Sequence, residues 1–307
     1  MSAPEAHPVA VTVRAGDGTS ASVVPALGAV VSSLCFPVAG ALREVLFRHA
    51  HFWDAASDAT RGGIPFLFPL CGRLQRDGRF GEYVCDRRTF TLPIHGFAMR
   101  RPWRVKEQAS DRVALSLNAM AEEGYPFFAR LSMVIEVQPR RVLLEAEIEN
   151  CGDSPMPFSG GWHPYFLTLD AGPEKGGVCV RLPARQAGRY DPSYTHISEW
   201  SEPLPSPLVP THPLFKEVLH RVDPGTISVD WPGLFSLEMR AELDSGTPFP
   251  FWQLHTEREK PFVCVEPWSS PPNALNSGDS LLHLAPGARQ RMQMTISLAN
   301  ARAESGR

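Results

Sequence analysis

Residues 131–148 read LSMVIEVQPRRVLLEAEI, and in both halves of this stretch apolar and polar side chains alternate. Alternation with a period of two residues is typical of a β-strand that buries one face. The same pattern recurs, with turn-forming clusters between the segments, at 9–13, 113–117, 236–239 and 292–298. Because no amphipathic helices separate these segments, the sequence predicts an all-β fold, an antiparallel sandwich.

The composition agrees with a sheet-rich chain. Of the 307 residues, 43% are hydrophobic, and 30 prolines and 24 glycines are dispersed along the chain, where they interrupt long helices. This length allows one large core or two modest ones, but sheet-rich chains of this size often remain single domains. We therefore expect one domain over residues 1–307.

Charge and hydropathy exclude several classes of partner. The chain has 30 basic and 33 acidic residues, a formal net charge of -3, and no basic run that could follow a phosphate backbone. No stretch approaches the roughly 20 apolar residues that span a bilayer, and Met1 to Ala10 lack the features of a signal peptide. We expect a soluble, cytoplasmic protein, a monomer or homodimer, that binds neither nucleic acid nor membranes.

The six cysteines are scattered and show no CxxC spacing. Most of them lie in apolar, strand-like surroundings, which favours reduced, buried thiols over a disulfide framework.

Two glycine-containing stretches carry a cation or an imidazole. In 62–73, GGIPFLFPLCGR, an apolar run ends in Arg73, whose guanidinium suits a sugar hydroxyl or a carboxylate, although pairing with a structural acid is the commoner role. In 92–99, LPIHGFAM, His95 lies between a proline-containing segment and a glycine, a loop-like position for a functional side chain.

Two further stretches carry the residues most suited to acid–base chemistry. In 158–166, FSGGWHPYF, His163 lies among aromatic residues such as Trp162, whose faces suit the apolar side of a pyranose. In 261–268, PFVCVEPW, Glu266 ends an apolar strand, where burial should raise the pKa of its carboxyl group, as a general base near neutrality requires.

In this order, the four stretches resemble the aldose 1-epimerase family: GGIPFLFP followed by GR, HGF followed by RPW, then GWHPYF and VCVEPW. Each motif alone is weakly specific, whereas four ordered matches with an ionisable group in each are strong. The resemblance extends from about residue 20 to 298. It implies the galactose mutarotase-like fold, a large antiparallel β-sandwich (supersandwich) with the sugar on its concave face.

The resemblance also implies roles for the site residues. Glu266 would take the proton of the anomeric hydroxyl, and His163 would protonate the ring oxygen, so that the ring opens and recloses to the other anomer. His95 and Arg73 would hold the sugar, and Trp162 is a further candidate contact. No cofactor or metal is needed for this reaction.

This chain departs from the family pattern in two places. The acidic residue that often contacts sugar hydroxyls between GWHPYF and VCVEPW has no clear counterpart; Asp223 and Asp230 are both candidates, and we take Asp223 as the contact. Leu70, Cys71 and Gly72 replace the more usual polar or aromatic residues before the arginine, so the preferred sugar stays open.

Three alternatives remain open. A hexose-6-phosphate epimerase of the same superfamily would add a phosphate clamp, for which Arg61, Arg76, Arg79 and Arg100 are candidates. A sugar-binding protein without turnover would keep the concave face alone. A glycosidase or lyase is less favoured, because glycoside hydrolysis usually needs two carboxylates and only Glu266 lies in a suitable setting.

Overall fold

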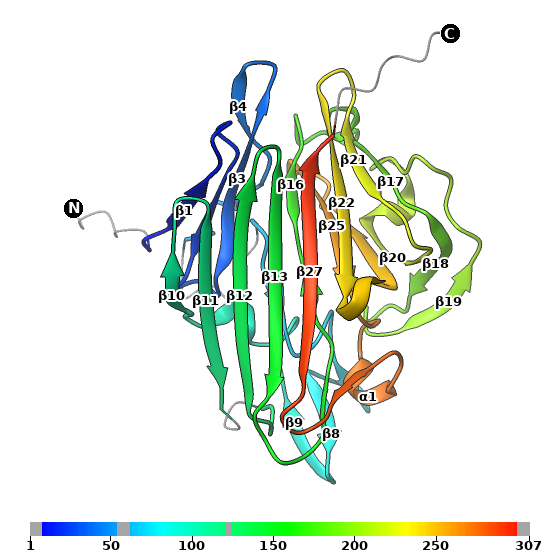
Figure 1. The fold of residues 1–307 in the computed structure, drawn as a ribbon. Coiled ribbons are helices and arrows are strands. Elements are labelled where there is room, and N and C mark those ends of the chain that lie inside the picture. Colours follow the sequence, from blue (N-terminus) through cyan, green and yellow to red (C-terminus); the bar gives the residue numbers. More distant parts are fainter. Residues whose placement is uncertain (1–7, 54–61, 121–123, 300–307) are drawn as a thin grey trace, which may run out of the picture.

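The structure is a computed structural model that describes residues 8–53, 62–120 and 124–299 (Figure 1). The alternating stretch that opens the sequence analysis forms β12 (Ala129–Gln138) and β13 (Arg141–Asn150), which pair antiparallel over their full lengths. Their buried positions alternate, as the sequence predicts, because successive side chains of a strand point to opposite faces.

These two strands lie within a sheet of nine. In spatial order its strands are β10 (Arg104–Gln108), β11 (Arg112–Ala119), β12, β13, β27 (Arg289–Leu298), β22 (Phe235–Leu243), β21 (Ile227–Trp231) and β17 (Cys179–Arg181), with β23 (Thr247–Pro248) paired to β22.

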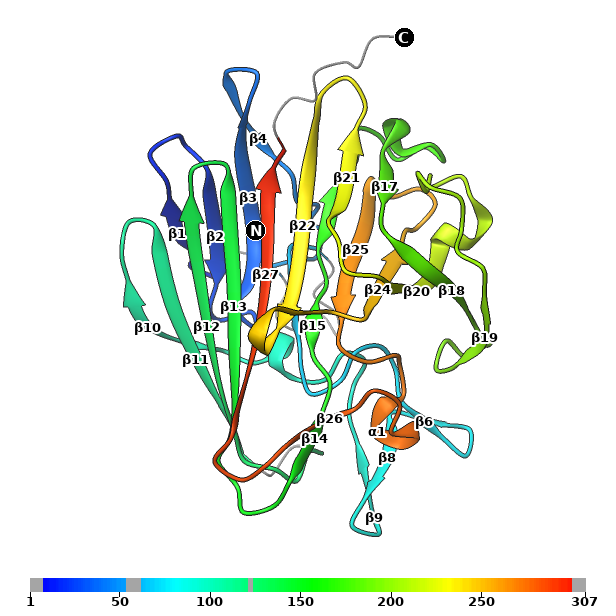
Figure 2. The ribbon, with the colours of Figure 1, turned by 45° about the vertical axis from the view of Figure 1, so that its right-hand side comes forward.

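The second sheet has eight strands and carries the residues that the sequence selects for acid–base chemistry. Its order is β19 (Ile197–Ser201), β18 (Ala184–Tyr190), β20 (Glu217–Val222), β24 (Phe251–His255), β25 (Phe262–Trp268), β15 (Gly161–Trp162) and β5 (Phe66–Leu67), with β16 (Tyr165–Leu167) also paired to β25. Figure 2 shows β18, β20 and β24 beside the long strands of the larger sheet.

Smaller elements complete the described part of the chain. The other strands are β1 (Val11–Arg14), β2 (Ser20–Val24), β3 (Val30–Val38), β4 (Ala41–Glu44), β6 (Gln75–Arg76), β7 (Arg79–Phe80), β8 (Glu82–Cys85), β9 (Arg88–Thr91), β14 (Met156–Phe158) and β26 (Leu282–Leu284). The helical turns are η1 (Ala98–Arg100), η2 (Lys175–Gly177), η3 (Pro213–Lys216), η4 (Asp244–Gly246) and α1 (Ala274–Ser277). None of the helices in the described ranges has the length or apolar character to cross a membrane.

The two large sheets share one hydrophobic core. Leu144 and Met239 of the larger sheet belong to the same buried cluster as Trp252 and Val265 of the second sheet. Each fully buried side chain of this kind contributes about 1.5–3 kcal/mol relative to an exposed one. The predicted all-β antiparallel sandwich is therefore confirmed.

The prediction of buried cysteines holds for three of the six, and Cys35 and Cys85 are half-buried. All six thiols are free, and Cys71, Cys179 and Cys264 are buried. Cys151, however, is exposed, because it lies in the turn that follows β13 and not within a strand.

Candidate active site

A cavity of about 450 Å³, which we call the main cavity, brings together four of the six predicted site residues. Arg73, His95, His163 and Glu266 all line it, although the segments that carry them lie far apart in the sequence. The volume lies within the range of about 300–1,000 Å³ that is usual for small-molecule sites.

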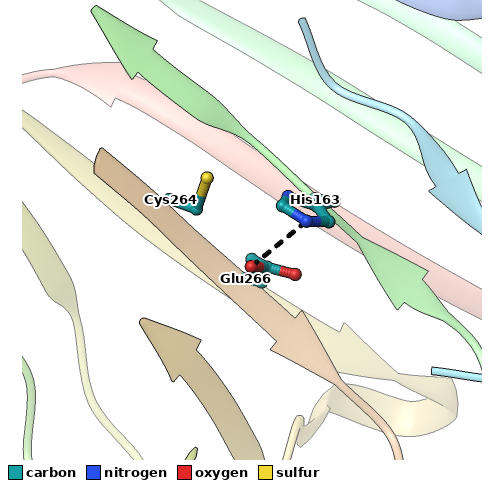
Figure 3. A group of neighbouring side chains, drawn as sticks. All are labelled: His163, Cys264 and Glu266. Atoms are coloured by element: carbon teal, nitrogen blue, oxygen red, sulfur yellow. Dashed lines mark ion pairs between the residues drawn. The ribbon is translucent and has the colours of Figure 1, made fainter. Parts of the chain in front are cut away.

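Strand pairing places His163 opposite Glu266. Gly161 of β15 pairs with Trp268 of β25, and Tyr165 of β16 pairs with Cys264 of the same strand. His163 lies two residues from Gly161 and two from Tyr165, and Glu266 lies two residues from each of their partners, so the same register places His163 opposite Glu266. Residues opposite each other on adjacent strands have side chains in contact. The measured separation is 3.4 Å between His163 Nε2 and Glu266 Oε1 (Figure 3).

The Glu266 carboxyl group is almost fully enclosed, with 1% of its side chain exposed. Burial raises its pKa well above the usual 4.5, and the nearby negative charge of Glu217 raises it further, while a hydrogen bond from Trp268 opposes the shift. That bond runs from Trp268 Nε1 to Glu266 Oε2 over 3.1 Å. The raised pKa predicted from the apolar strand end is confirmed in direction, and it makes this carboxylate a stronger base than an exposed one.

Aromatic stacking fixes the plane of the His163 imidazole. Its ring lies parallel to that of Tyr165, with centroids 4.4 Å apart and planes 3° apart. The Tyr165 hydroxyl lies 3.3 Å from His163 Nε2. Because residues two apart on a strand share a face, Tyr165 could have been recognised from its spacing to His163, although the sequence analysis gives it no role.

His95 is held by a reciprocal pair of bonds with Gly72. The His95 amide donates to the Gly72 carbonyl at 2.9 Å, and the Gly72 amide donates to His95 Nδ1 at 3.1 Å. Burial and the positive charges of Arg100 and Arg73 lower the pKa of His95 to about 3. The ring is therefore neutral near pH 7, and since Nδ1 accepts a bond, its proton resides on Nε2.

Arg73 is available to a ligand. Its guanidinium carbon lies 5.8 Å from the centre of the Tyr194 ring, and within the described ranges no carboxylate lies at ion-pair distance from it. This arrangement argues against the commoner role of pairing with a structural acid.

The expectations for Trp162 and Asp223 are wrong. Trp162 is fully buried and packs against Phe66 and Phe249 in the core, because adjacent residues of a strand face opposite ways and its neighbour His163 faces the main cavity. Asp223 follows β20 and lines a separate surface depression. The other candidate, Asp230, lies in the larger sheet and pairs with Arg181.

Besides Glu257, the acidic residue between GWHPYF and VCVEPW that lines the main cavity is Glu217. It lines the main cavity at the start of β20, and its Oε2 lies 2.9 Å from Nδ1 of His255, another residue of the cavity wall. Although burial lowers the pKa of His255, the hydrogen bond and charge of Glu217 outweigh this effect, so the net shift is upward.

Two polar side chains, Tyr190 of the cavity wall and Gln253, extend this pair into a hydrogen-bond network. Tyr190 donates to Oε1 of Gln253 at 2.8 Å, and the amide nitrogen of Gln253 donates to Oε1 of Glu217 at 2.7 Å. Gln253 itself is 1% exposed and pairs in register with Glu266. The network fixes the orientation of the Glu217 carboxylate.

Of the four candidate phosphate-binding arginines, the three in the described residues do not converge. Arg100 lines the main cavity, whereas Arg76 and Arg79 lie on the β6–β7 hairpin next to the acids Asp77 and Glu82. Arg61 lies outside the described residues.

Comparisons with known proteins identify distant relatives of this chain. LacX (chromosomal) of Lactococcus lactis subsp. lactis is 22% identical over 258 residues, which cover 75% of this chain and 81% of LacX. The uncharacterized protein YihR of Escherichia coli (strain K12) is 25% identical over 239 residues, covering 74% of this chain and 73% of YihR.

Solved structures show the same fold. The Slr1438 protein from Synechocystis sp. PCC 6803 superimposes with a TM-score of 0.80 at 24% identity, covering 97% of this chain and 98% of that one. Galactose 1-epimerase from Lactobacillus acidophilus NCFM gives a TM-score of 0.72 at 12% identity, covering 97% and 96%. The sequence model of the aldose 1-epimerase family matches residues 10–176, more than half of the chain. The chain therefore belongs to the aldose 1-epimerase family.

Proposed function

We propose that this protein interconverts the α and β anomers of a monosaccharide by opening and closing its ring. The observation that carries the proposal is the 3.4 Å separation of His163 Nε2 and Glu266 Oε1 in the wall of the main cavity. The two oxygens of a hemiacetal share one carbon, so an acid and a base that serve them must lie a few ångströms apart.

The reaction divides into proton transfers by these two residues. Glu266 takes the proton of the anomeric hydroxyl, whose electrons form the carbonyl, while the bond from the anomeric carbon to the ring oxygen breaks and His163 protonates that oxygen. Rotation about the bond between the first two carbons exposes the other carbonyl face. The transfers then run in reverse and close the ring to the other anomer. Each catalysed proton transfer accelerates the reaction by about a hundredfold to ten-thousandfold.

The remaining polar groups of the cavity suit sugar binding. Neutral His95 offers the Nε2 proton to a sugar oxygen, Arg73 offers a fixed cation, and the Glu217 carboxylate accepts from hydroxyl groups. Trp268, which lies 5.8 Å from the His95 ring, offers an aromatic surface for the apolar face of a pyranose.

Replacing the acid or the base tests this proposal. We expect Glu266→Gln and His163→Asn each to lower kcat by about a hundredfold or more with the fold intact, measured by two-dimensional exchange NMR on glucose and galactose. The matched controls Glu238→Gln and His283→Asn change exposed residues and should retain the rate. Near-normal turnover in either site variant would refute the roles, and sugar binding without faster anomer exchange in the wild type would favour a binding protein.

A phosphorylated sugar is a second candidate substrate. Arg100 and Lys216 line the main cavity together with Arg73, so three cations face the same space. The same exchange measurement with glucose 6-phosphate distinguishes the two. A rate constant at least tenfold above that for free glucose would assign the phosphate ester.

A further inference from the structure

Cys264 lies beside the acid and the base but has no part in the proposed reaction. It precedes Glu266 by two residues on β25, so both side chains face the same way, and it pairs in register with Tyr165. Its thiol is fully buried. Figure 3 shows Cys264, Glu266 and His163 as neighbours.

The three side chains offer one set of donor atoms for a metal ion. A ring nitrogen of His163, the Cys264 sulfur and a Glu266 oxygen all lie within 4.8 Å of one another. The 3.4 Å between His163 Nε2 and Glu266 Oε1 is close to the roughly 3.3 Å between two ligands of a tetrahedral Zn²⁺ with bonds of about 2.0–2.1 Å. With a Zn–S bond of about 2.3 Å, the sulfur must move closer to the other donors by up to about 1.3 Å, which requires a rotation about its Cα–Cβ bond.

The chemistry of the donors selects the ion. Imidazole nitrogen, thiolate sulfur and carboxylate oxygen are the three ligand types of protein zinc sites, whereas Mg²⁺ and Ca²⁺ prefer oxygen alone. On binding, Cys264 releases its thiol proton, and Glu266, where it is protonated, releases its carboxyl proton; both protons pass to solvent. The site then contains one thiolate, one carboxylate, a neutral imidazole and Zn²⁺, so its charges sum to zero, which favours a buried position.

The main cavity gives an entering ion access to two of the three donors. His163 and Glu266 line it, so an ion that enters through the cavity meets these two residues first and the thiol of Cys264 beside them. Three protein ligands with one open position are typical of non-structural zinc sites.

We propose that His163, Cys264 and Glu266 form a Zn²⁺ site, and that the bound ion inhibits the epimerase by occupying its acid and its base. The binding part of this proposal stands on the geometry alone. The inhibition rests on the proposed function.

Direct binding is measured with Co²⁺, which substitutes for Zn²⁺ and gives a near-ultraviolet charge-transfer absorption when a thiolate coordinates it. Metal-free wild-type protein should gain this band, and Zn²⁺ should abolish it by displacement. Cys264→Ser should lack the band, whereas Cys151→Ser, which removes the exposed thiol, should keep it. A wild type without the band, or a band lost in Cys151→Ser and kept in Cys264→Ser, would overturn the site.

Inhibition is measured on the same proteins by anomer exchange. Zn²⁺ should slow the wild type, a chelator should restore the rate, and Mg²⁺ should have no effect. Cys264→Ser should keep the basal rate and need at least about tenfold more Zn²⁺ for equal inhibition. Equal sensitivity of wild type and variant would refute the role of Cys264.

The two readouts separate the two proposals. A cobalt band in a protein without epimerase activity would support the metal site and refute the proposed function. Epimerase activity without a cobalt band would support the proposed function and refute the metal site. If circular dichroism shows that Cys264→Ser does not fold, Cys264→Ala serves in its place, because it adds no polar atom to the buried position.

Discussion

Burial moves the pKa values of two residues of the main cavity in opposite directions. It raises that of the Glu266 carboxyl group and lowers that of the His95 imidazole to about 3, and both shifts favour the uncharged form. The His95 imidazole is therefore neutral near pH 7. Glu266 can act as a base only above its raised pKa.

The pH dependence of the rate should report this shift. Because turnover requires the Glu266 carboxylate, kcat/KM should rise with pH through the pKa of Glu266, so the acidic limb should lie above pH 4.5. Loss of the proton of the general acid should bound the profile on the alkaline side and give a bell shape. The measurement is anomer exchange across a pH series.

Two variants test the cause of the shift. Glu217→Gln removes a charge that raises the pKa of Glu266, so it should move the acidic limb to lower pH. Trp268→Phe removes the hydrogen bond that lowers it, and should move the limb to higher pH. A limb that stays in place in both variants would show that Glu266 does not set it.

At the level of strands, the sequence predicts which face of a strand is buried but not which strands pair with it. The alternation in 131–148 assigns the buried side of β12 and β13 correctly, because that property depends on residues close in the chain. Because adjacent residues of an extended segment face opposite sides, Trp162 cannot face the main cavity if His163 does. In the sequence the aromatic residues around His163 form one cluster, whereas in the fold Trp162 packs in the core on the opposite face.

Glu217 and His255 illustrate what local pattern cannot reveal. They form a pair across β20 and β24, 38 residues apart in the chain, and only the pairing of these strands brings them together. Neither FKEVLH nor FWQLHT contains a signal for this contact. The four recognised motifs were found because ionisable groups stand out beside glycine, proline and aromatic residues.

The turn that carries His95 depends on Gly96. This glycine has a φ of 75°, and a Cβ atom there would lie 2.2 Å from the Phe68 carbonyl oxygen. Gly96→Ala should therefore displace the turn, raise KM for the sugar and lower the free energy of unfolding, measured in urea, by about 1–3 kcal/mol more than its control.

The control is Gly78→Ala. Gly78 has a similar φ of 81°, but no atom lies within 4 Å of the added Cβ, so only the backbone conformation is unfavourable, by about 1–2 kcal/mol. Equal losses of stability in the two variants would show that the contact with Phe68 does not matter.

At the scale of the whole molecule, the core of the sandwich contains a histidine that the proposed reaction does not use. His220 lies on β20, is fully buried, and pairs in register with Trp252 of β24. Burial lowers the pKa of its imidazole to about 4. A charge in this position would have to be accommodated between the two sheets, which favours unfolding.

The stability of the protein should therefore fall in mild acid. His95 and His220 both have lower pKa values folded than the roughly 6.5 of an unfolded chain, so below that pH the unfolded state binds more protons. The two neutral imidazoles contribute fully to the free energy of unfolding above about pH 6.5. The contribution of His220 is lost as the pH falls to about 4, and that of His95 as it falls to about 3. His220 accounts for up to about 3 kcal/mol of this loss.

Urea unfolding of wild type and His220→Leu at pH 7 and pH 4.5 measures the effect. The variant should lose less stability between the two pH values than the wild type, because an apolar side chain takes up no proton. The raised pKa of Glu266 acts in the opposite direction, but it is common to both proteins and cancels in the comparison. His283→Leu, at an exposed position, should keep the wild-type slope, and the same slope in all three proteins would show that the buried imidazole does not control acid stability.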